Sequence, residues 1–253
     1  TLNTQNIQTK QFTWSTDLTF STYNDRWKER DPNWKPAAYQ KEQDPIRGVF
    51  AYVADGLLQP GEEAPAHQPQ LLPGQVKLKN INGDDKLNEE DMVLIGRNDP
   101  KFIFGFNNNF SYKNFDLNIY MYGQVGKIAG ANSYYDAWGS YGNRIKLGQN
   151  VPVSFKDAWS SDNQTSTRPS FIESAYGTGD LFLQKISFLR IRNITLGYTV
   201  PISKSICNRL RVYADINNPC VWTNWKGQDP ETDSNTNAYP NVTSFSIGVD
   251  ISF

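Results

Sequence analysis

The sequence predicts an all-β fold, the arc of a large antiparallel transmembrane β-barrel, and three observations lead to this prediction. Apolar and polar side chains alternate with period 2 in several long runs, which places one class of side chain on each face of a strand. The runs are about 11 residues long, close to the length that crosses a bilayer at barrel tilt and longer than most soluble strands. Short and long connections alternate between the runs, as the turns and external loops of an outer-membrane barrel do.

Each predicted strand rests on its own alternating run. The runs lie at residues 11–20, 102–112, 115–122, 186–200, 209–217 and 243–253. The pair 102–112 and 115–122 predicts a long hairpin, because only Lys113 and Asn114 separate its strands. Residues 1–4 are expected to be a stub of a strand that turns near Asn6. About six strands and a stub cannot close a bacterial membrane barrel, which has at least about eight.

The whole chain, residues 1–253, is therefore expected to be the C-terminal portion of a receptor-type barrel whose plug and earlier strands are absent. Alternation alone does not exclude a soluble β-sandwich, which would bury the same apolar face. Aromatic residues at the ends of the runs favour the membrane barrel, because such barrels carry aromatic girdles. The alternative that remains is a secreted carbohydrate-binding β-sandwich with a calcium loop.

Composition excludes several kinds of function. The chain has one histidine, His67 in a Pro-rich stretch, so a hydrolase of the Ser-His-Asp kind is not expected. The net charge is −1, without a cluster of Lys and Arg, so no nucleic-acid partner is expected. No apolar run is long enough for a transmembrane helix.

Several ordered segments resemble one known family. They are Leu72–Leu87, Ile95–Phe106, Ser187–Tyr198, Gly227–Glu231, and Tyr239-Pro240 followed by the last strand. In this order they resemble the C-terminal half of SusC/RagA-type TonB-dependent transporters of Bacteroidota, and the resemblance covers essentially all of the chain.

The resemblance implies a cell outer-membrane barrel of about 22 strands with a plugged lumen. It also implies import of oligosaccharide or oligopeptide nutrients, with a SusD-like surface lipoprotein as lid and a glycan or peptide as ligand. Energy would come from TonB through the N-terminal part, which these residues do not include. The resemblance therefore implies a transporter and not an enzyme. A siderophore importer is an alternative within the same class.

Residues 80–91 fit an EF-hand-like loop that could bind Ca²⁺ or Mg²⁺ weakly. The oxygen ligands at positions 1, 3, 5, 7 and 12 would be Asn80, Asn82, Asp84, the Lys86 carbonyl and Asp91. Position 6 is Asp85 where the pattern has glycine, and few of the ligands are anionic, so a turn-rich loop held by Asx side chains is the alternative. No other cofactor is expected.

Aromatic residues in the long connections are candidate substrate contacts, because sugars and peptides both stack on aromatic rings. The candidates are Tyr134, Tyr135, Trp138, Trp159, Trp222 and Trp225. The alternative is that they pack the loops against one another or against the lid.

Two predictions concern single residues. Cys207 and Cys220 are expected to be free thiols, because a mostly extended segment separates them. Phe253, which follows alternating apolar residues, resembles the signal read by the machinery that inserts outer-membrane barrels.

Overall fold

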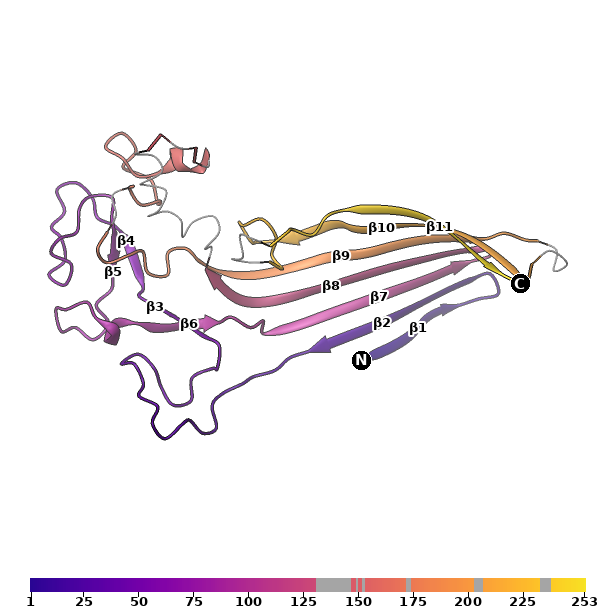
Figure 1. Ribbon diagram of the computed structural model, residues 1–253, viewed down its shortest axis with the longest axis horizontal. Coiled ribbons are helices and arrows are strands. Elements are labelled where there is room, and N and C mark those ends of the chain that lie inside the picture. Colours follow the sequence, from indigo (N-terminus) through magenta and orange to yellow (C-terminus); the bar gives the residue numbers. More distant parts are fainter. Residues whose placement is uncertain (131–146, 149, 152, 172–173, 203–206, 233–237) are drawn as a thin grey trace.

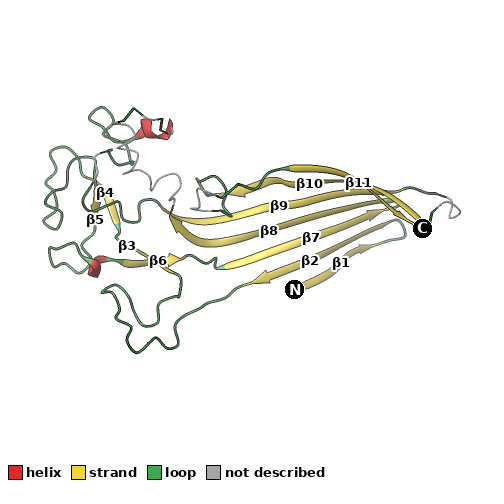
Figure 2. Ribbon diagram, viewed as in Figure 1, coloured by secondary structure: helices red, strands yellow, loops and turns green. Residues whose placement is uncertain are grey.

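The computed structural model describes residues 1–130, 147–148, 150–151, 153–171, 174–202, 207–232 and 238–253. In these residues the protein is all-β apart from two short 3₁₀ helices (Figures 1 and 2). One antiparallel sheet of seven strands has the order β1-β2-β7-β8-β9-β10-β11. Its strands are β1 (Leu2–Gln8), β2 (Phe12–Ser21), β7 (Phe102–Tyr112), β8 (Phe115–Gly130), β9 (Leu183–Thr199), β10 (Arg209–Thr223) and β11 (Ser244–Ser252).

The remaining elements lie in the long connections, at the opposite end of the molecule from the C-terminus (Figure 1). They are β3 (Gly48–Ala51) paired with β6 (Val93–Arg97), β4 (Ala54–Leu57) paired with β5 (Val76–Leu78), and the helices η1 (Glu89–Asp91) and η2 (Val153–Asp157). The β1–β2 and β7–β8 turns, the end of β9 and the start of β10 lie at the end that holds the C-terminus. The predicted separation of turns from long loops is confirmed.

The long strands confirm the alternation and extend it. β8, β9 and β10 have 16, 17 and 15 residues, so they are longer than predicted at the loop end. The pairing of β8 with β9 shifts register after Tyr120 and after Val125, and that of β10 with β9 shifts after Asn217. Each bulge moves the alternation by one residue, so a strict period-2 pattern stops short of the true strand end.

The first strand corrects the prediction. The expected stub, residues 1–4 with a turn near Asn6, is instead the seven-residue strand β1, which pairs with β2 as far as Gln8. A bulge between Gln5 and Ile7 interrupts the alternation at Asn6. The turn follows at residues 9–11, where the hydroxyl of Thr9 accepts a hydrogen bond from the backbone N–H of Phe12 at 2.9 Å.

Register aligns residues of one class across all seven strands. One row is apolar and contains Ile7, Trp14, Phe110, Leu117, Leu196, Ala214 and Ile247. The adjacent row is polar and contains Gln5, Ser15, Asn109, Asn118, Thr195, Asp215 and Ser246. We call the two sides of the sheet the apolar face and the polar face.

The apolar face is exposed. Phe20, Leu196 and Ile247 expose 59, 52 and 83% of their surface, and Phe253 exposes 88% beyond the end of β11. A β-sandwich would bury these side chains under a second sheet, but the described residues place none there. An exposed apolar face with a polar opposite face is the arrangement of a membrane barrel wall.

A bulge in β9 determines what lies on the loop end of the polar face. Pairing with β8 steps from Asn193 to Ile191, so Arg192 is an extra residue. Beyond the bulge Arg190 pairs with Tyr122 and therefore joins the polar face. Without the extra residue the side chain of Arg190 would point to the apolar side.

The connections have a small core of their own around Leu57, Val76 and Leu78. Gln68 is fully buried beside it, where its Oε1 accepts a hydrogen bond from the backbone N–H of Leu78 at 2.7 Å. Cys207 and Cys220 are free thiols, as predicted.

Within the ranges given above, no helix has the length and apolarity needed to cross a membrane.

Candidate functional site

The polar face carries hydrogen-bonded amides and hydroxyls along the middle of the sheet. Asn118 donates to Oδ1 of Asn107 at 2.6 Å and to Oδ1 of Asn109 at 2.7 Å. Further along, Asn193 donates to Asn217 at 3.0 Å. These side chains bridge neighbouring strands, and hydrogen bonds between them satisfy part of their polar groups.

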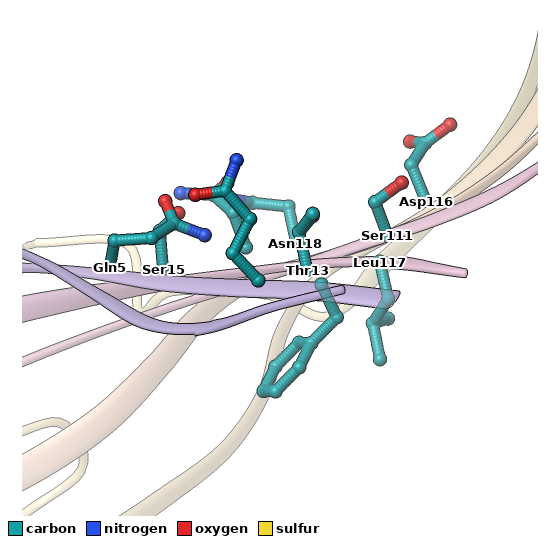
Figure 3. Close-up of a pocket in the computed structure, with 10 residues that line it drawn as sticks. Gln5, Thr13, Ser15, Ser111, Asp116, Leu117 and Asn118 are labelled. Atoms are coloured by element: carbon teal, nitrogen blue, oxygen red, sulfur yellow. The ribbon is translucent and has the colours of Figure 1, made fainter. Parts of the chain in front are cut away.

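A shallow hollow of about 300 Å³ opens on this face near the β1–β2 turn (Figure 3). Most of its lining side chains are amides or hydroxyls: Gln5, Gln8, Thr13, Ser15, Asn109, Ser111 and Asn118. Its charged residue, Asp116, is paired with Arg211. The hollow is therefore suited to hydrogen bonding with a neutral polar group rather than to an ionic ligand.

An ion-pair bridge spans the turn end of the polar face. Arg211 in β10 donates to the carboxylate of Asp116 in β8 at 2.9 and 2.5 Å and to Asp250 in β11 at 3.1 Å. To reach β8 the guanidinium crosses Gly197 of β9, where a Cβ on the glycine would lie 2.4 Å from an Arg211 nitrogen. Because residue 197 is glycine, the side chain of Arg211 can cross β9 and connect β10 with β8 and β11.

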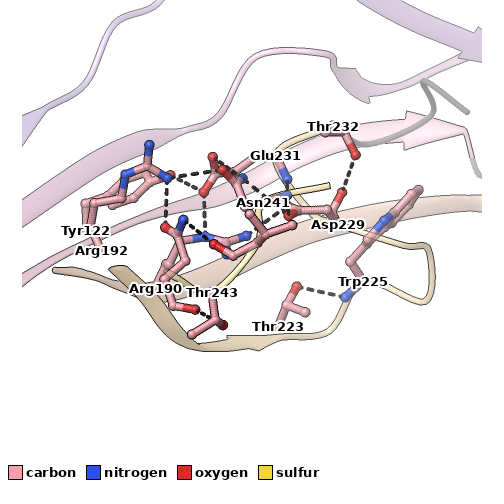
Figure 4. Close-up of polar contacts among 12 residues, drawn as sticks. Tyr122, Arg190, Arg192, Thr223, Trp225, Asp229, Glu231, Thr232, Asn241 and Thr243 are labelled. Atoms are coloured by element: carbon pink, nitrogen blue, oxygen red, sulfur yellow. Dashed lines mark hydrogen bonds and ion pairs between the residues drawn. The ribbon is translucent and has the colours of Figure 1, made fainter. Parts of the chain in front are cut away.

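A second charged cluster lies at the loop end of the same face (Figure 4). Arg190 forms ion pairs with Asp229 at 2.8 Å and with Glu231 at 2.6 Å, both from the connection between β10 and β11. The side chains of Arg190 and Asp229 are only 3 and 5% exposed. Tyr122 of β8 donates its hydroxyl proton to Glu231. The connection is therefore attached to the wall of the sheet by a buried charge pair.

Further contacts close the same connection. Oδ2 of Asp229 accepts a hydrogen bond from the backbone N–H of Asn241 at 3.0 Å, just before β11 begins. At the other end Trp225 is 6% exposed and packs in a cluster with Ala129 and Ile186. The described parts of the connection, up to residue 232 and from residue 238, therefore lie against the polar face. Sequence reasoning identified the segments that contain Arg190 and Asp229 but not their pairing, because the bulge at Arg192 decides which side Arg190 faces.

The structure places three of the six predicted substrate aromatics. Trp159 packs against the small core of the connections and donates to Oε1 of Gln59 at 3.4 Å. Trp222 pairs with Leu189 in the sheet and is 53% exposed, and Trp225 is buried as described above. Tyr134, Tyr135 and Trp138 lie outside the described residues. A role for the six in ligand contact stays a prediction.

The predicted metal loop is organised by hydrogen bonds to its own backbone. Oδ1 of Asn80, Asn82 and Asp84 accepts from the backbone N–H of Gly83, Asp84 and Lys86 at 2.5, 3.1 and 3.0 Å. These are Asx turns, which the alternative interpretation of the loop also expects.

The end of the loop is held by Asp91. This residue is fully buried, and its carboxylate accepts from the backbone N–H of Ile81 at 2.7 Å and of Asn88 at 3.0 Å. Asp85, at the position where the pattern has glycine, takes the left-handed conformation with φ 59°. Among the described residues there is no group of three or more His, Cys, Asp or Glu arranged to hold a metal. Binding of Ca²⁺ or Mg²⁺ stays a prediction.

The connection between β2 and β3 is anchored by charges on β6. Arg97 donates to Oδ1 of Asn24 at 2.6 Å, forms an ion pair with Asp25 and lies over the ring of Tyr23. Partial burial and the hydrogen bond to Asp99 raise the pKa of Tyr23 above its ordinary value.

The same connection holds an aromatic cluster that sequence reasoning missed. Trp27, Trp34 and Tyr39 lie there with Arg30 among them. The spacing of Trp27, Arg30 and Trp34, with an arginine between two nearby indoles, was the signal that could have indicated it.

Comparison with known proteins shows which β-barrel proteins this chain resembles. No protein-family model matches the chain. The chain is 26% identical over its full length to TonB-dependent receptor P3 of Formosa agariphila, of which it covers 28%. It is also 26% identical, over 68% of its length, to TonB-dependent receptor SusC of Bacteroides thetaiotaomicron. The structure of the RagAB peptide transporter matches 99% of the chain with a TM-score of 0.74 and 20% identity.

The resemblance to SusC/RagA-type TonB-dependent receptors is confirmed. The chain spans about 28% of the length of the first relatives it matches, and it covers 28% of the matched RagAB chain. These relatives are receptors and transporters rather than enzymes. The seven-stranded sheet is a segment of the wall of an outer-membrane β-barrel, with the apolar face toward lipid and the polar face toward the lumen.

Proposed function

We infer that the complete protein imports oligosaccharide or oligopeptide nutrients across the outer membrane in a TonB-dependent manner. The observation that carries this proposal is the pair of adjacent rows, one apolar and one polar, that run unbroken across all seven strands. A soluble sandwich would also have both rows but would bury the apolar one, whereas here the apolar row is exposed, as in a wall that meets lipid on one side and a watery lumen on the other. Relatives named as receptors and a structure described as a peptide transporter support the same function.

In this function the described residues act as wall and as loop support. The amides and hydroxyls of the polar face offer neutral hydrogen bonds to a polar cargo or to the plug, which the remaining chain would supply. The Arg190 cluster holds the β10–β11 connection against the lumenal side and so shapes the external end of the lumen. The Arg211 bridge secures the opposite end.

We assign the partners by the same reasoning. A SusD-like surface lipoprotein would cover the external connections, which form small sheets and a core of their own above the barrel wall. TonB would act through the part of the receptor that lies outside these residues. The described core gives the lipoprotein a preformed surface to contact.

The function is tested by deleting the complete receptor gene in the source organism and measuring uptake. Labelled oligosaccharides, labelled peptides and an iron–siderophore complex are supplied in separate cultures. We expect lost uptake of one of the first two classes and its restoration by the intact gene, with no restoration when TonB is also absent. Loss of siderophore uptake alone would establish the siderophore importer instead, and unchanged uptake of every probe would refute import.

A further inference from the structure

A cavity of about 340 Å³ lies in the external connections, between the β2–β3 connection and the residue that follows η1. It is separate from the lumenal wall and contains none of the predicted substrate aromatics. Its walls combine rings and polar groups: Trp27, Arg30, Tyr39, Gln40, Asp44 and Phe50. This volume lies within the range of small-ligand sites, roughly 300–1,000 Å³.

Arg30 is the central feature of this cavity. Its guanidinium carbon lies 3.8 Å from the ring centroid of Trp34 and 4.7 Å from that of Trp27. Within the described part of the chain Arg30 forms no ion pair, and its Nε is buried without a hydrogen-bond partner. Two indoles therefore hold this cation in place, where a carboxylate usually would.

The opposite wall is aromatic. The rings of Tyr39 and Phe50 pack at 4.9 Å between centroids with a tilt of 50°. A second hollow of about 390 Å³ adjoins the first, because Arg30 and Gln40 line both. Two adjoining hollows that share a donor side chain suit a ligand made of linked units of similar size.

We propose that these two hollows are a binding subsite for consecutive sugar rings of a neutral oligosaccharide. The proposal rests on the import function and names the class of cargo. The apolar faces of a pyranose stack on aromatic rings, and its hydroxyls both donate and accept hydrogen bonds. Arg30 and the amide nitrogen of Gln40 supply donors and the carboxylate of Asp44 supplies an acceptor, so the lining can both donate to and accept from hydroxyl groups.

Other ligand classes fit these walls less well. An apolar peptide side chain would fill the cavity and leave the buried Nε of Arg30 without a hydrogen-bond acceptor, which costs free energy in a desolvated site. A strongly anionic ligand would meet Asp44 in the first hollow, and in the second it would meet three carboxylates, Glu29, Asp31 and Glu42, which outnumber the cations Lys28 and Arg30. Neutral hydroxylated rings avoid both penalties.

Binding is measured with the complete receptor purified in detergent, together with any lipoprotein that copurifies. Isothermal titration calorimetry uses maltohexaose, xylohexaose, mannohexaose, laminarihexaose and a tryptic digest of casein as probes. The variants are Trp27→Ala, which removes one ring, and Arg30→Lys, which keeps the charge but loses the planar group that stacks on the indoles. Trp14→Ala is the matched control, because it removes a tryptophan from the apolar row of the sheet that lines neither hollow and is not among the candidate ligand contacts.

We expect at least one hexasaccharide to bind, and both variants in the connection to bind it about tenfold or more weakly. The control should stay within about twofold of the unaltered receptor. Binding of casein peptides alone, binding of none of the probes, or equal affinity in the Arg30→Lys receptor would overturn the proposal. Uptake by cells with the unaltered receptor distinguishes failure of the subsite from failure of the import function. If these cells take up the oligosaccharide and the Trp27→Ala receptor binds it normally, only the subsite is refuted. If these cells show no uptake, the import function is refuted.

Discussion

The buried charge cluster around Arg190 gives the most direct test of how the polar face is built. Replacing Arg190 with Met keeps much of its length and removes its charge, so Asp229 stays buried with no cation beside it. Removing one partner of a buried ion pair costs about 3–5 kcal/mol. Asp229 keeps hydrogen bonds from the backbone N–H of Glu231 and Asn241, and the side chain of Glu231 is 24% exposed. The cost should therefore fall near the lower limit, about 3 kcal/mol.

That free energy acts on the attachment of the β10–β11 connection, because every contact of Arg190 with a carboxylate goes to this segment. A loss of about 3 kcal/mol raises the population of the detached connection roughly a hundredfold. Hydrogen exchange measured by mass spectrometry on the complete receptor reports this population for peptides that cover 225–232 and 238–243. Exchange there should accelerate by up to that factor, while the strands β7 and β8 should stay unchanged.

Arg192→Met is the control for this experiment. Arg192 is two residues further along β9 and donates to the amide oxygens of Asn218 and Asn241, with no carboxylate partner in the described structure. Its loss should cost about 1 kcal/mol per hydrogen bond at most. If exchange in the connection rises less than about threefold in Arg190→Met, or rises as much in the control, the attachment does not depend on the buried charge.

Three further predictions concern other parts of the chain. Gly197→Ala should push Arg211 away from Asp116 on β8 and lower the free energy of unfolding of the barrel by about 1–3 kcal/mol. Urea unfolding in detergent measures this change, and an unchanged free energy of unfolding would show that the ion pair between Arg211 and Asp116 is not needed. Hydrogen bonds from the side chain of Lys77 and from the backbone N–H of Gln59 hold the pKa of Glu62 below its usual range. The ionised Glu62 carboxylate therefore contributes to local stability above its pKa in the unfolded chain, and this contribution disappears as pH falls through its pKa in the folded protein. The protection of amides near Lys77 from hydrogen exchange, taken relative to the intrinsic exchange rate at each pH, should fall on acidification in the unaltered receptor and much less in Glu62→Gln. Calorimetry at millimolar Ca²⁺ should show heat that Asp84→Asn abolishes, and its absence in the unaltered receptor would dismiss the metal loop.

Period-2 alternation was enough to predict the long strands because it depends on local geometry alone. Residues 243–253 could be assigned to one strand and its two faces from the sequence, and β11 agrees within one residue at each end. The same reasoning stopped early where a bulge interrupts the alternation, as at Asn6 in β1 and after Asn217 in β10. A bulge leaves no mark in composition, since it is set by how two strands pair and not by either strand alone.

The site was harder to predict because its contacts join segments far apart in the chain. Arg190 and Asp229 are separated by 39 residues, and Arg211 and Asp116 by 95. Alternation predicts that Arg211 and Asp116 share the polar face, but only the strand order places them one strand apart, with Gly197 between. The small sheets of the connections went unpredicted for a related reason: β3 to β6 have three to five residues each, too few for a periodic pattern to appear.

Arg190 and Arg211, the two ion-paired arginines of the polar face, stabilise different parts of the structure. Each arginine contacts two carboxylates, so each of the two groups of charges is negative overall. Arg211 connects β8, β10 and β11 near the turns, where its partners are strands and its loss must loosen the sheet itself. Arg190 is more deeply buried and its partners belong to a connection, so its loss frees the connection while the backbone pairing of β9 remains. Stability of the wall and position of the external connection are therefore set by different residues, and a change in lumen shape need not weaken the barrel.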